Sequence, residues 1–523
     1  MSAVRAALQR RRPRAEGAGA WLAAGCVALS LLLLGALLLL IAVRGLGHFW
    51  PASVSLVELD DGRRLAGRAV RELPLPDGEG RERLYFTGNR GLDGQVWHWL
   101  PVARIVAESR PRDLVVLERR RWGDFIGRLV AVEPAPDAVA AGAGNGATAW
   151  AQLEARLAAL ERLREARDTL QRETIRPLAR RLEADPGDGE ARRALAAATA
   201  RAARLRAAMD ETILVLESVD GRRLRQPLDE VLAARRPNAL STWEKLAAWM
   251  QGVWRFLSEG PSAANSAGGV WPAIFGTVLM VLVMSLLVTP FGVLAAFYLN
   301  EVAHQGRLTR LVRIAVRNLA GVPSIVYGVF GLGVFVYGLG GTLDEWFFSD
   351  ALPTPTFGTG GLLWASLTLA LLTLPVVIVA SEEGLARIPD HQREGALALG
   401  ATRLEMLGRV VLPMAVPAML TGVILAIARA AGEVVPLMLV GVAKLAPQIP
   451  VDGDFPFLHL DRKFMHLGYH IYGAAFHGDD VQAAMPLVFA TALLLVLVIL
   501  VLNLTAIFLR HHVSTRHAAP SRR

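Results

Sequence analysis

The sequence predicts a polytopic α-helical membrane protein with six transmembrane helices and a large extracytoplasmic α+β insertion. Apolar runs near the length of about 20 residues that a membrane-spanning helix needs recur along the chain. A long polar stretch separates the first of these runs from the second. The runs occupy residues 21–43, 270–299, 319–339, 362–380, 415–442 and 486–509.

Arginines close to the runs predict that both ends of the chain are cytoplasmic, because positive residues next to a span favour that side. Such arginines occur in the tail 1–20, in the loop 301–318 and in the tail 512–523. The connection 340–361 has acidic residues and no Lys or Arg, which places it on the opposite side. The run 21–43 is longer than the apolar core of a signal peptide and no small-x-small cleavage site follows it, so we predict a retained anchor.

The segment 44–265 is too long for a loop and has the size of a domain, which six spans place outside the cytoplasm. Its first part alternates β-branched and aromatic residues between Gly- and Asp-rich turns, a pattern typical of a small β module. AGAGNGA at 141–147 has the composition of a linker. The expected strands are Val54–Leu59, Arg83–Phe86, Trp97–Val106, Leu114–Leu117 and Arg128–Val132.

Two helical segments follow. Leucines at helical spacing predict an antiparallel hairpin over 150–213, interrupted by ADPGDGE at 184–190. VLESVDGRRLRQPL, which comes after it, echoes VELDDGRRLAG near the start of the domain. Either two strand-turn-strand pieces flank an inserted hairpin, or the similarity of the turns is chance. A Trp-rich apolar face over 240–257 favours a helix lying on the membrane surface over one packed in a core.

Several functional classes are excluded or disfavoured. No lysine follows a glycine as a phosphate-binding loop requires, so the chain does not itself hydrolyse ATP by that route. The arginines are scattered, which argues against nucleic-acid binding. Cys26 is the single cysteine and lies inside the first run. We predict no catalytic residue, metal site or cofactor, although four histidines cluster near the last run: His459, His466, His470 and His477.

Arg429 and Glu433 are two charges inside the otherwise apolar run 415–442. In a continuous helix, residues four apart project from the same face. One such charge at the centre of a span costs about 2.5–3.5 kcal/mol, so both should face protein or water rather than lipid. We predict that they line a path or gate for an anionic substrate, since a guanidinium recognises oxyanions. The alternative is a structural ion pair that locks the helices together.

The stretch REGALALGATRLEMLGRVVLP, 393–413, is polar although it lies between two apolar runs. Its residues predict a helix up to Leu399, a turn at Gly400 and a second short helix over 403–411 that ends before Pro413. Small residues lie on these helices, where another protein can approach closely. A plain cytoplasmic hairpin is the alternative.

These residues carry a resemblance. Glu394, Ala396, Gly400, Leu412 and Pro413 resemble the coupling-loop signature of ABC importer permeases. NLAGVPSIVYG (318–328), TGVILAIARAAGEVVPLMLVG (421–441) and NLTAIFLR (503–510) are similar to the phosphate-specific permeases, and a proline soon after Glu433 fits the PstA group better than the sister PstC group. The similarity covers about 270–510. It implies a binding-protein-dependent ABC permease domain over 266–511, with a coupling loop over 382–413.

The resemblance also implies partners. These are a sister phosphate permease, cytoplasmic ATPase subunits that receive Glu394 through Pro413, and a periplasmic phosphate-binding protein, all at the bacterial inner membrane with its lipid. Two positions depart from the pattern: Gly395 stands where relatives have alanine, and Val379 where some have arginine. The domain 44–265 lies beyond the common core, and docking of the binding protein or contact with the sister permease are both open for it.

The function predicted from the sequence is therefore that of a permease subunit of an ATP-driven importer of inorganic phosphate, not itself an enzyme. Importers of other oxyanions, such as sulfate, molybdate or phosphonate, are the alternative within transport. A membrane sensor that transports nothing is the alternative from another class. The coupling stretch and the Arg429–Glu433 pair favour transport, because a sensor needs neither.

Overall fold

The computed structural model describes residues 18–517 except 76–79, 121, 135–145, 210–211, 262–267, 447, 454 and 478–479. The predicted linker 141–147 and the predicted tails 1–20 and 512–523 therefore lie partly outside the described residues. The chain divides into two compact units, one of Met1–His48 with Val253–Arg523 and one of Phe49–Gly252.

The unit Phe49–Gly252 contains two five-stranded antiparallel sheets. In the first sheet the strand order is β4-β3-β2-β1-β5, and Leu56 of β1 faces Ala66 of β2 on one side and Ser109 of β5 on the other. The elements are β1 (Ser55–Leu59), β2 (Arg64–Pro74), β3 (Arg81–Phe86), α3 (Arg90–Asp93), β4 (Trp97–Pro101), η1 (Val102–Arg104) and β5 (Ile105–Ser109). The predicted single strand 97–106 is wrong, because the chain turns through the 3₁₀ helix η1 directly after Pro101, which has no N–H to donate to a sheet.

The second sheet repeats the topology of the first. Its order, β9-β8-β7-β6-β10, matches the first sheet strand for strand, and a 3₁₀ turn preceded by a proline again separates the fourth strand from the fifth. Its elements are β6 (Leu114–Arg119), β7 (Phe125–Pro134), β8 (Thr212–Glu217), β9 (Arg223–Pro227), η3 (Leu228–Glu230) and β10 (Val231–Arg235). The two echoing segments are the hairpins β1–β2 and β8–β9, which do not hold equivalent places in the two sheets.

The helical hairpin leaves the second sheet after β7 and returns at β8, and these two strands pair with each other from Arg128 and Glu217 to Pro134 and Thr212. Its base is anchored, because Trp150, Leu153 and Met209 pack on the sheet residues Leu117 and Leu214. The elements are α4 (Gly146–Leu170), the π-helical turn η2 (Gln171–Ile175), α5 (Arg176–Ala184) and α6 (Gly189–Met209). The predicted hairpin end at 213 is wrong, since the helix ends at Met209 and Ile213 belongs to β8.

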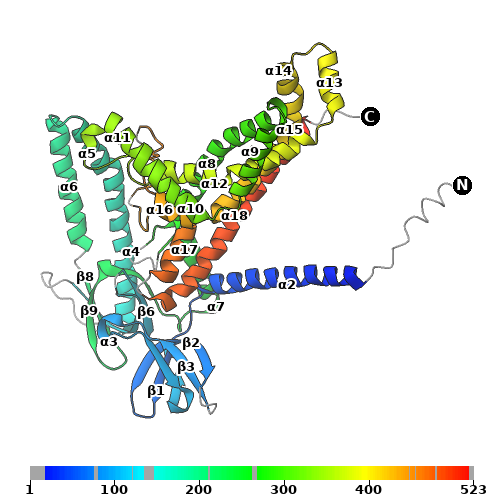
Figure 1. Cartoon of the computed structure of the whole chain (residues 1–523). Coiled ribbons are helices and arrows are strands. Elements are labelled where there is room, and N and C mark those ends of the chain that lie inside the picture. Colours follow the sequence, from blue (N-terminus) through cyan, green and yellow to red (C-terminus); the bar gives the residue numbers. More distant parts are fainter. Residues whose placement is uncertain are drawn as a thin grey trace. The chain divides into compact units, whose positions relative to one another are not determined.

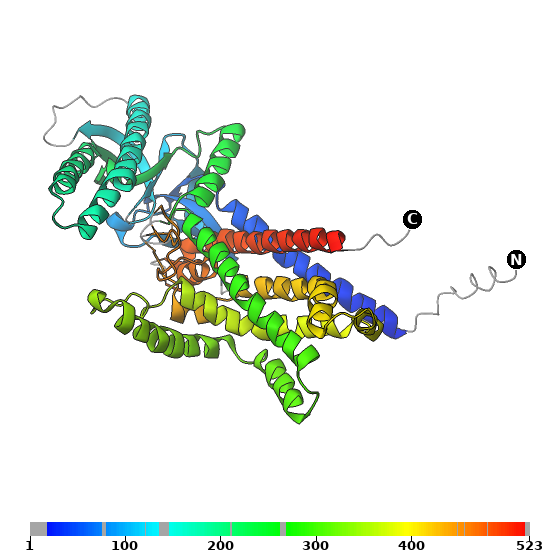
Figure 2. The ribbon, with the colours of Figure 1, turned by 90° about the horizontal axis from the view of Figure 1, so that it is seen from above.

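The unit Met1–His48 with Val253–Arg523 is helical (Figures 1 and 2), and six of its helices are long and apolar enough to cross a membrane. This confirms the predicted number of spans. They are Gly19–Gly47, Trp271–Val302, Ser324–Phe347, Leu362–Ala386, Arg403–Gly432 and Val481–His512. The elements are α2 (Ala18–Gly47), α8 (Trp271–Phe297), η4 (Tyr298–Val302), α9 (Arg307–Leu319), α10 (Ser324–Phe330), η5 (Gly331–Gly340), α11 (Gly341–Phe347), η6 (Ser349–Ala351), α12 (Leu362–Ala386), α13 (Asp390–Ala398), α14 (Arg403–Met406), η7 (Leu407–Val411), α15 (Leu412–Gly432), α16 (Val435–Val440), α17 (Leu467–Phe476) and α18 (Val481–His517).

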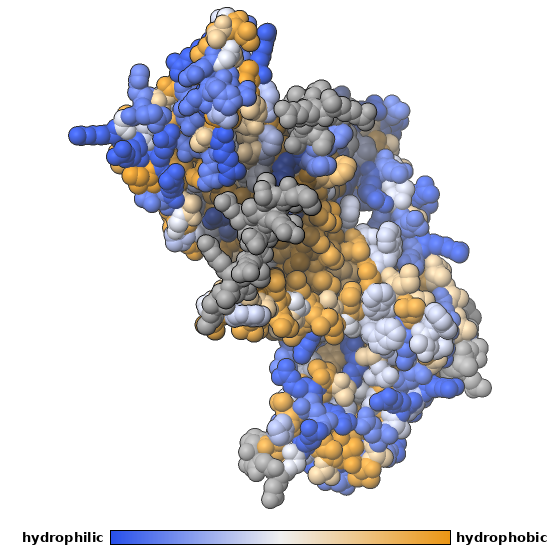
Figure 3. Space-filling model, turned by 90° about the vertical axis from the view of Figure 1, so that its right-hand side faces the viewer, coloured by the Kyte–Doolittle hydropathy of each residue, from blue (hydrophilic) through white to orange (hydrophobic). Residues whose placement is uncertain are grey.

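Helix α12 is the centre of this unit and packs between α8 and α15. Its buried residues share one core with Met280 and Met284 of α8 and with Ala426 and Ala430 of α15. A β-carbon on Gly384 of α12 would overlap Ala418 of α15, so these two helices approach too closely for any larger side chain. The outer faces of the spans are apolar and exposed, and Figure 3 shows apolar side chains gathered in one broad area, as expected of helices that contact lipid.

Helix α7 (Thr242–Ser258) covers the stretch predicted to lie on the membrane surface. Trp243, Met250 and Trp254 are exposed on it. This exposure fits the predicted interfacial position, which stays a prediction.

Two buried histidines in the segment before α18 predict a loss of stability in acid. His466 and His470 are almost wholly buried, and burial lowers the pKa of each to about 4. Both ring nitrogens of His470 lack a hydrogen-bond partner among the described residues. Because the folded-state pKa lies below the unfolded value near 6.5, these histidines do not affect stability above about pH 6.5, and stability falls as the unfolded chain takes up protons below it.

We expect His470→Leu to reduce this acid sensitivity. Between about pH 7.5 and about pH 5, the native protein in detergent should lose about 2 kcal/mol more than the variant in its free energy of unfolding. Thermal unfolding at both pH values measures the difference. The contribution of carboxylates to the pH dependence cancels in this comparison, because both proteins carry the same carboxylates. His477→Leu, at the exposed end of α17, is the control and should keep the native behaviour. Equal acid sensitivity in His470→Leu and the native protein would contradict the prediction.

Candidate functional site

The stretch 393–413 forms a helical turn that projects from the ends of α12 and α15. Helix α12 ends at Ala386, and α13 then runs from Asp390 to Ala398. Gly400 has φ +87°, a left-handed conformation that glycine adopts without strain. Thr402 begins α14 with a reciprocal cap, in which its hydroxyl accepts from the Glu405 N–H and the Glu405 carboxylate accepts from the Thr402 N–H.

The predicted end of the second short helix before Pro413 is wrong. Helix α14 continues through the π-helical turn η7 directly into α15, so that Arg403–Gly432 is one helical rod. Pro413 lies at the start of α15, just after the wide π turn, where its lack of an N–H is tolerated. A push on α14 therefore reaches α15 through continuous helix.

Arg393 fixes this stretch to the rest of the unit. Its Nη2 donates to the Glu301 carboxylate at 2.9 Å and to the Leu385 carbonyl at 3.0 Å, and its Nη1 donates to the Ile388 carbonyl at 2.7 Å. The side chains of Arg393 and Glu301 are only 17% and 9% exposed. The guanidinium thus joins α13 to the end of α12 and to η4, the extension of α8.

A second arginine strengthens the same junction. Arg403 Nη2 donates to the Glu301 carbonyl at 2.8 Å, so residues on both sides of Gly400 hold the end of the second span. Arg313 of α9 adds a third link, with Nε 3.0 Å from the Glu382 carboxylate and Nη2 2.8 Å from the Leu299 carbonyl. Sequence reasoning missed these residues. The signal that could have found them is that most of these charged residues lie close to the end of a helix.

The predicted coupling residues divide into two groups. Glu394, Gly395 and Gly400 are exposed, whereas Ala396 is partly buried against the core around Val411 and Leu407. Leu412 and Pro413 lie one helical stretch away, at the start of α15. Leu399 and Leu404 are large apolar side chains exposed beside the turn. A polar segment that displays leucines around a charged residue offers a surface suited to a protein partner.

The Arg429–Glu433 pair exists, but the helix does not continue through it. Arg429 lies in the last turn of α15, which ends at Gly432, and Glu433 is extended, with ψ 129°. Pro436 explains the break, because its ring would clash with the carbonyl of Gly432 in a continuing helix. The predicted shared helical face is therefore wrong, and so is the predicted run to Val442. Residues 435–440 form the separate short helix α16.

Despite the break, the two side chains meet. Arg429 Nε lies 3.6 Å from Glu433 Oε1, an ion pair rather than a close hydrogen bond. The side chains are 34% and 21% exposed. Their charged ends are therefore neither sealed in the core nor placed on an open surface.

The segments 318–328 and 421–441 pack against each other next to this pair. Gly328 of α10 lies so close to α16 that a β-carbon on it would come within 2.8 Å of the Pro436 Cα. The lack of a side chain at Gly328 therefore lets α10 pack closely against the start of α16, next to the break. A discontinuous helix with a charged end is a common way to build an ion site within a membrane domain.

The histidines and acidic residues near α17 do not form a metal site among the described residues. His459 Nε2 lies 2.8 Å from the Asp452 carboxylate, to which Arg462 also donates at 2.6 Å. His466 is buried at the N-cap of α17, and His470 is buried within α17.

Comparison with known proteins agrees with this arrangement. Residues 288–517 match the model of the binding-protein-dependent transport system inner membrane component. The phosphate transport system permease protein PstA 1 of Mycobacterium tuberculosis is 32% identical over 275 residues, which are 52% of this chain and 80% of that protein. The chain belongs to this family of ABC importer permeases. PstA of Yersinia pestis is 31% identical over 252 residues, which are 48% of this chain and 75% of that protein.

Solved structures are also similar to the permease. One shows inward-facing MetNI methionine ABC transporter, with 18% identity and a TM-score of 0.33 over 50% of the permease and 97% of that chain. Another shows a bacterial alginate ABC transporter, with 17% identity and a TM-score of 0.32 over 45% of the permease and 76% of that chain. The residues matched by the family model run from the second span to the sixth. The chain is a multi-pass inner-membrane protein and a transport component rather than a catalytic one.

Proposed function

We propose that this permease is part of an ATP-driven importer of inorganic phosphate and forms the translocation path with a sister permease. The observation that carries the proposal is the 32% identity to PstA 1 over 80% of that protein. A PstC protein of Xylella fastidiosa is also 32% identical to the chain over 67% of its own length, so PstA and PstC proteins share a common core. Such a core suits a pair of similar proteins around one path.

In this proposal Arg429 and Glu433 belong to the path or its gate. Arg429 offers a positive charge to a phosphate oxyanion at the break between α15 and α16. Glu433 neutralises it when no substrate is bound, and the 3.6 Å separation leaves the pair easy to open. Rocking of one helix bundle against another would expose the break alternately to each side.

The coupling residues receive the motion of separate ATPase subunits in the same proposal. Glu394, Gly395, Ala396 and Gly400 form the docking tip, and Leu412 and Pro413 begin the span that the tip moves. Arg393 keeps the tip attached to the second and fourth spans. This assignment puts the tip, both termini and α9 in the cytoplasm, and puts the unit Phe49–Gly252 on the periplasmic side, where a phosphate-binding protein delivers its ligand.

The test of the proposed function is uptake of radioactive phosphate into vesicles that contain the permease with the proteins that co-purify with it. We expect ATP-dependent uptake that unlabelled phosphate suppresses and that sulfate, molybdate and phosphonate do not. Suppression by one of those anions instead would transfer the proposal to that substrate. No transport of any oxyanion, with a complete complex, would contradict the proposal.

Charge reversal at the tip tests the docking role. Glu394 is exposed on α13, so Glu394→Lys should leave folding unchanged. We expect it to weaken association with the ATPase subunits about tenfold or to uncouple hydrolysis from uptake, because a like charge placed across an interface costs one or more kcal/mol. Pull-down and the ratio of hydrolysed ATP to imported phosphate measure this. Glu345→Lys, which reverses an exposed carboxylate on α11 outside the coupling loop, is the matched control. Unchanged binding and coupling in Glu394→Lys would contradict the docking role.

A further inference from the structure

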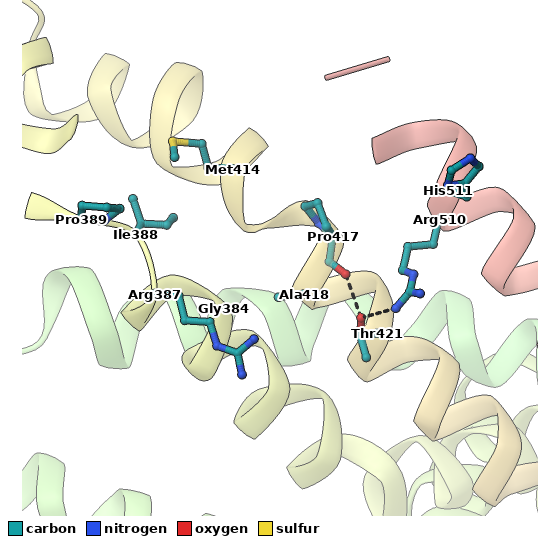
Figure 4. Close-up of a pocket in the computed structure, with 10 residues that line it drawn as sticks. All are labelled: Gly384, Arg387, Ile388, Pro389, Met414, Pro417, Ala418, Thr421, Arg510 and His511. Carbon is teal, nitrogen blue, oxygen red and sulfur yellow. Dashed lines mark hydrogen bonds between the residues drawn. The ribbon is translucent and has the colours of Figure 1, made fainter. Parts of the chain in front are cut away.

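A cavity of about 500 Å³ opens between the ends of three spans, on the side that carries α13 and α14 (Figure 4). The lining comes from the end of α12 and the loop after it, from the first turns of α15 and from the end of α18. It is half apolar, through Ile388, Met414, Pro417 and Ala418. Arg429, Glu433 and the coupling residues from Glu394 to Pro413 do not line it, although Arg387, Ile388 and Pro389 belong to the first part of the coupling loop 382–413.

The polar half of the lining is cationic. Arg387 follows α12, while Arg510 and His511 lie on α18, and the lining contains no Asp or Glu. Arg387 Nη2 lies 3.9 Å from the Glu383 carboxylate, a loose ion pair rather than a hydrogen bond. Two permanent positive charges and one titratable ring therefore share a concave site with little compensation.

Arg510 is held across the cavity rather than left free to swing into solvent. Its Nη1 donates to the Thr421 hydroxyl at 3.1 Å, and that hydroxyl donates to the Pro417 carbonyl at 2.9 Å (Figure 4). This uses one of the five N–H donors of the guanidinium. Within the described part of the chain no other acceptor is bonded to it, so the remaining donors are available to an anion.

The site lies where apolar and aqueous surroundings meet. The spans Leu362–Ala386 and Val481–His512 both end at its rim, and the apolar outer face of α18 continues directly from it. A small hydrated anion gains nothing from the apolar half of such a site, whereas the headgroup of a phospholipid brings a phosphate and an adjoining apolar part together. Basic pockets between spans are known to take anionic headgroups.

We propose that this cavity binds the phosphate group of an anionic phospholipid, with Arg387 and Arg510 as the phosphate ligands. Free inorganic phosphate has the same chemistry, and the experiment below separates the two sources. A lipid in the cavity touches Pro389, which precedes α13, and Met414, which follows the coupling stretch. It therefore braces both ends of the segment 390–413 against α18, independently of which substrate the permease carries.

The test measures binding of phosphatidylglycerol and phosphatidylcholine to the full chain in neutral detergent, by native mass spectrometry and by thermal stabilisation. Each basic residue near a headgroup contributes about 1 kcal/mol. We therefore expect the Kd for phosphatidylglycerol to rise about fivefold in Arg387→Gln and about 25-fold in Arg387→Gln with Arg510→Gln. Phosphatidylcholine should bind weakly and equally to every variant.

Arg317→Gln is the matched control, because Arg317 is an exposed arginine of α9 that does not line the cavity, and it should bind as the native chain does. Arg387 is 79% exposed, so its single variant decides the question even if the double variant does not fold. Native affinity for phosphatidylglycerol in Arg387→Gln would overturn the proposal. Stabilisation by inorganic phosphate alone, lost in the same variants, would overturn the lipid assignment in favour of a free phosphate site.

Discussion

Arg429→Gln is expected to lower phosphate uptake by about 10- to 100-fold while the complex assembles normally. A hydrogen bond between charged groups contributes about 1.5–3 kcal/mol, and glutamine keeps a polar side chain but removes the charge that attracts the oxyanion. Glu433 then stands uncompensated at the break in the helix and repels the substrate. Uptake of radioactive phosphate into vesicles measures the loss, and co-purification of the partner proteins checks assembly.

Two further variants distinguish a role of Arg429 in the phosphate path from a purely structural role. Arg429→Lys keeps the charge without the planar fork, so we expect partial uptake. Glu433→Gln leaves the cation alone and should tighten phosphate binding but slow its release. A purely structural pair would instead lower the yield of folded protein equally for Arg429→Gln and Glu433→Gln, and normal uptake in Arg429→Gln would remove this residue from the path.

Arg393→Ala is expected to cost about 3 kcal/mol of stability, because it leaves the carboxylate of Glu301, only 9% exposed, without its cationic partner and with Asn300 Nδ2 as its remaining donor. The same change frees α13 from the ends of α8 and α12. We therefore also expect hydrolysis of ATP by the assembled complex to continue while less phosphate is imported per ATP. Thermal unfolding measures the first effect, and the ratio of phosphate to ATP measures the second.

The double variant Arg393→Ala with Glu301→Gln tests the cause. It removes the stranded charge, so it should recover part of the stability but none of the coupling. Arg409→Ala, an exposed arginine of η7, is the control and should change stability by less than about 0.5 kcal/mol. Full coupling of ATP hydrolysis to uptake in the stable double variant would show that the Arg393–Glu301 ion pair serves folding alone.

The fold was predictable where the signal is local. Apolar runs of sufficient length predicted the spans, since the membrane imposes both composition and length. The break after Gly432 also has a local signal, because the ring of Pro436 disfavours the helical carbonyl geometry four residues earlier. That signal alone does not locate a break, since Pro290, Pro375 and Pro417 lie inside continuous helices. The strand pair β7–β8 joins Pro134 to Thr212 across an inserted helical hairpin, and no local pattern reveals such pairing.

The site was predictable only in part for the same reason. The charges of Arg429 and Glu433 stand out within an apolar run, and Gly400 marks its own turn with φ +87°. Arg393 and Glu301 are 92 residues apart, and each looks like an ordinary charge at the end of a helix. Only the packed structure shows that both side chains are largely shielded from solvent and that one arginine links three helical segments.

Gly395 also has a clearer meaning. A β-carbon on it would meet nothing within 4 Å, so the chain's own packing does not require glycine there. Alanine would stabilise α13 by about 0.5–1 kcal/mol through helix propensity. Close approach of a partner at the exposed tip stays a prediction for this glycine, and Gly395→Ala tests it, because the change should stabilise α13 and weaken the association only if a partner needs the space.

The repeated five-stranded sheet carries the helical hairpin of the unit Phe49–Gly252 as an insertion. In the first copy only residues 75–80 connect the second strand to the third, and in the second copy the whole hairpin α4–α6 occupies that connection without altering the strand order. The entropy of closing a loop grows only slowly with its length, so the sheet folds with either connection. The second copy of the sheet therefore holds the hairpin as an insertion between its second and third strands, so the sheet and the hairpin can be altered separately.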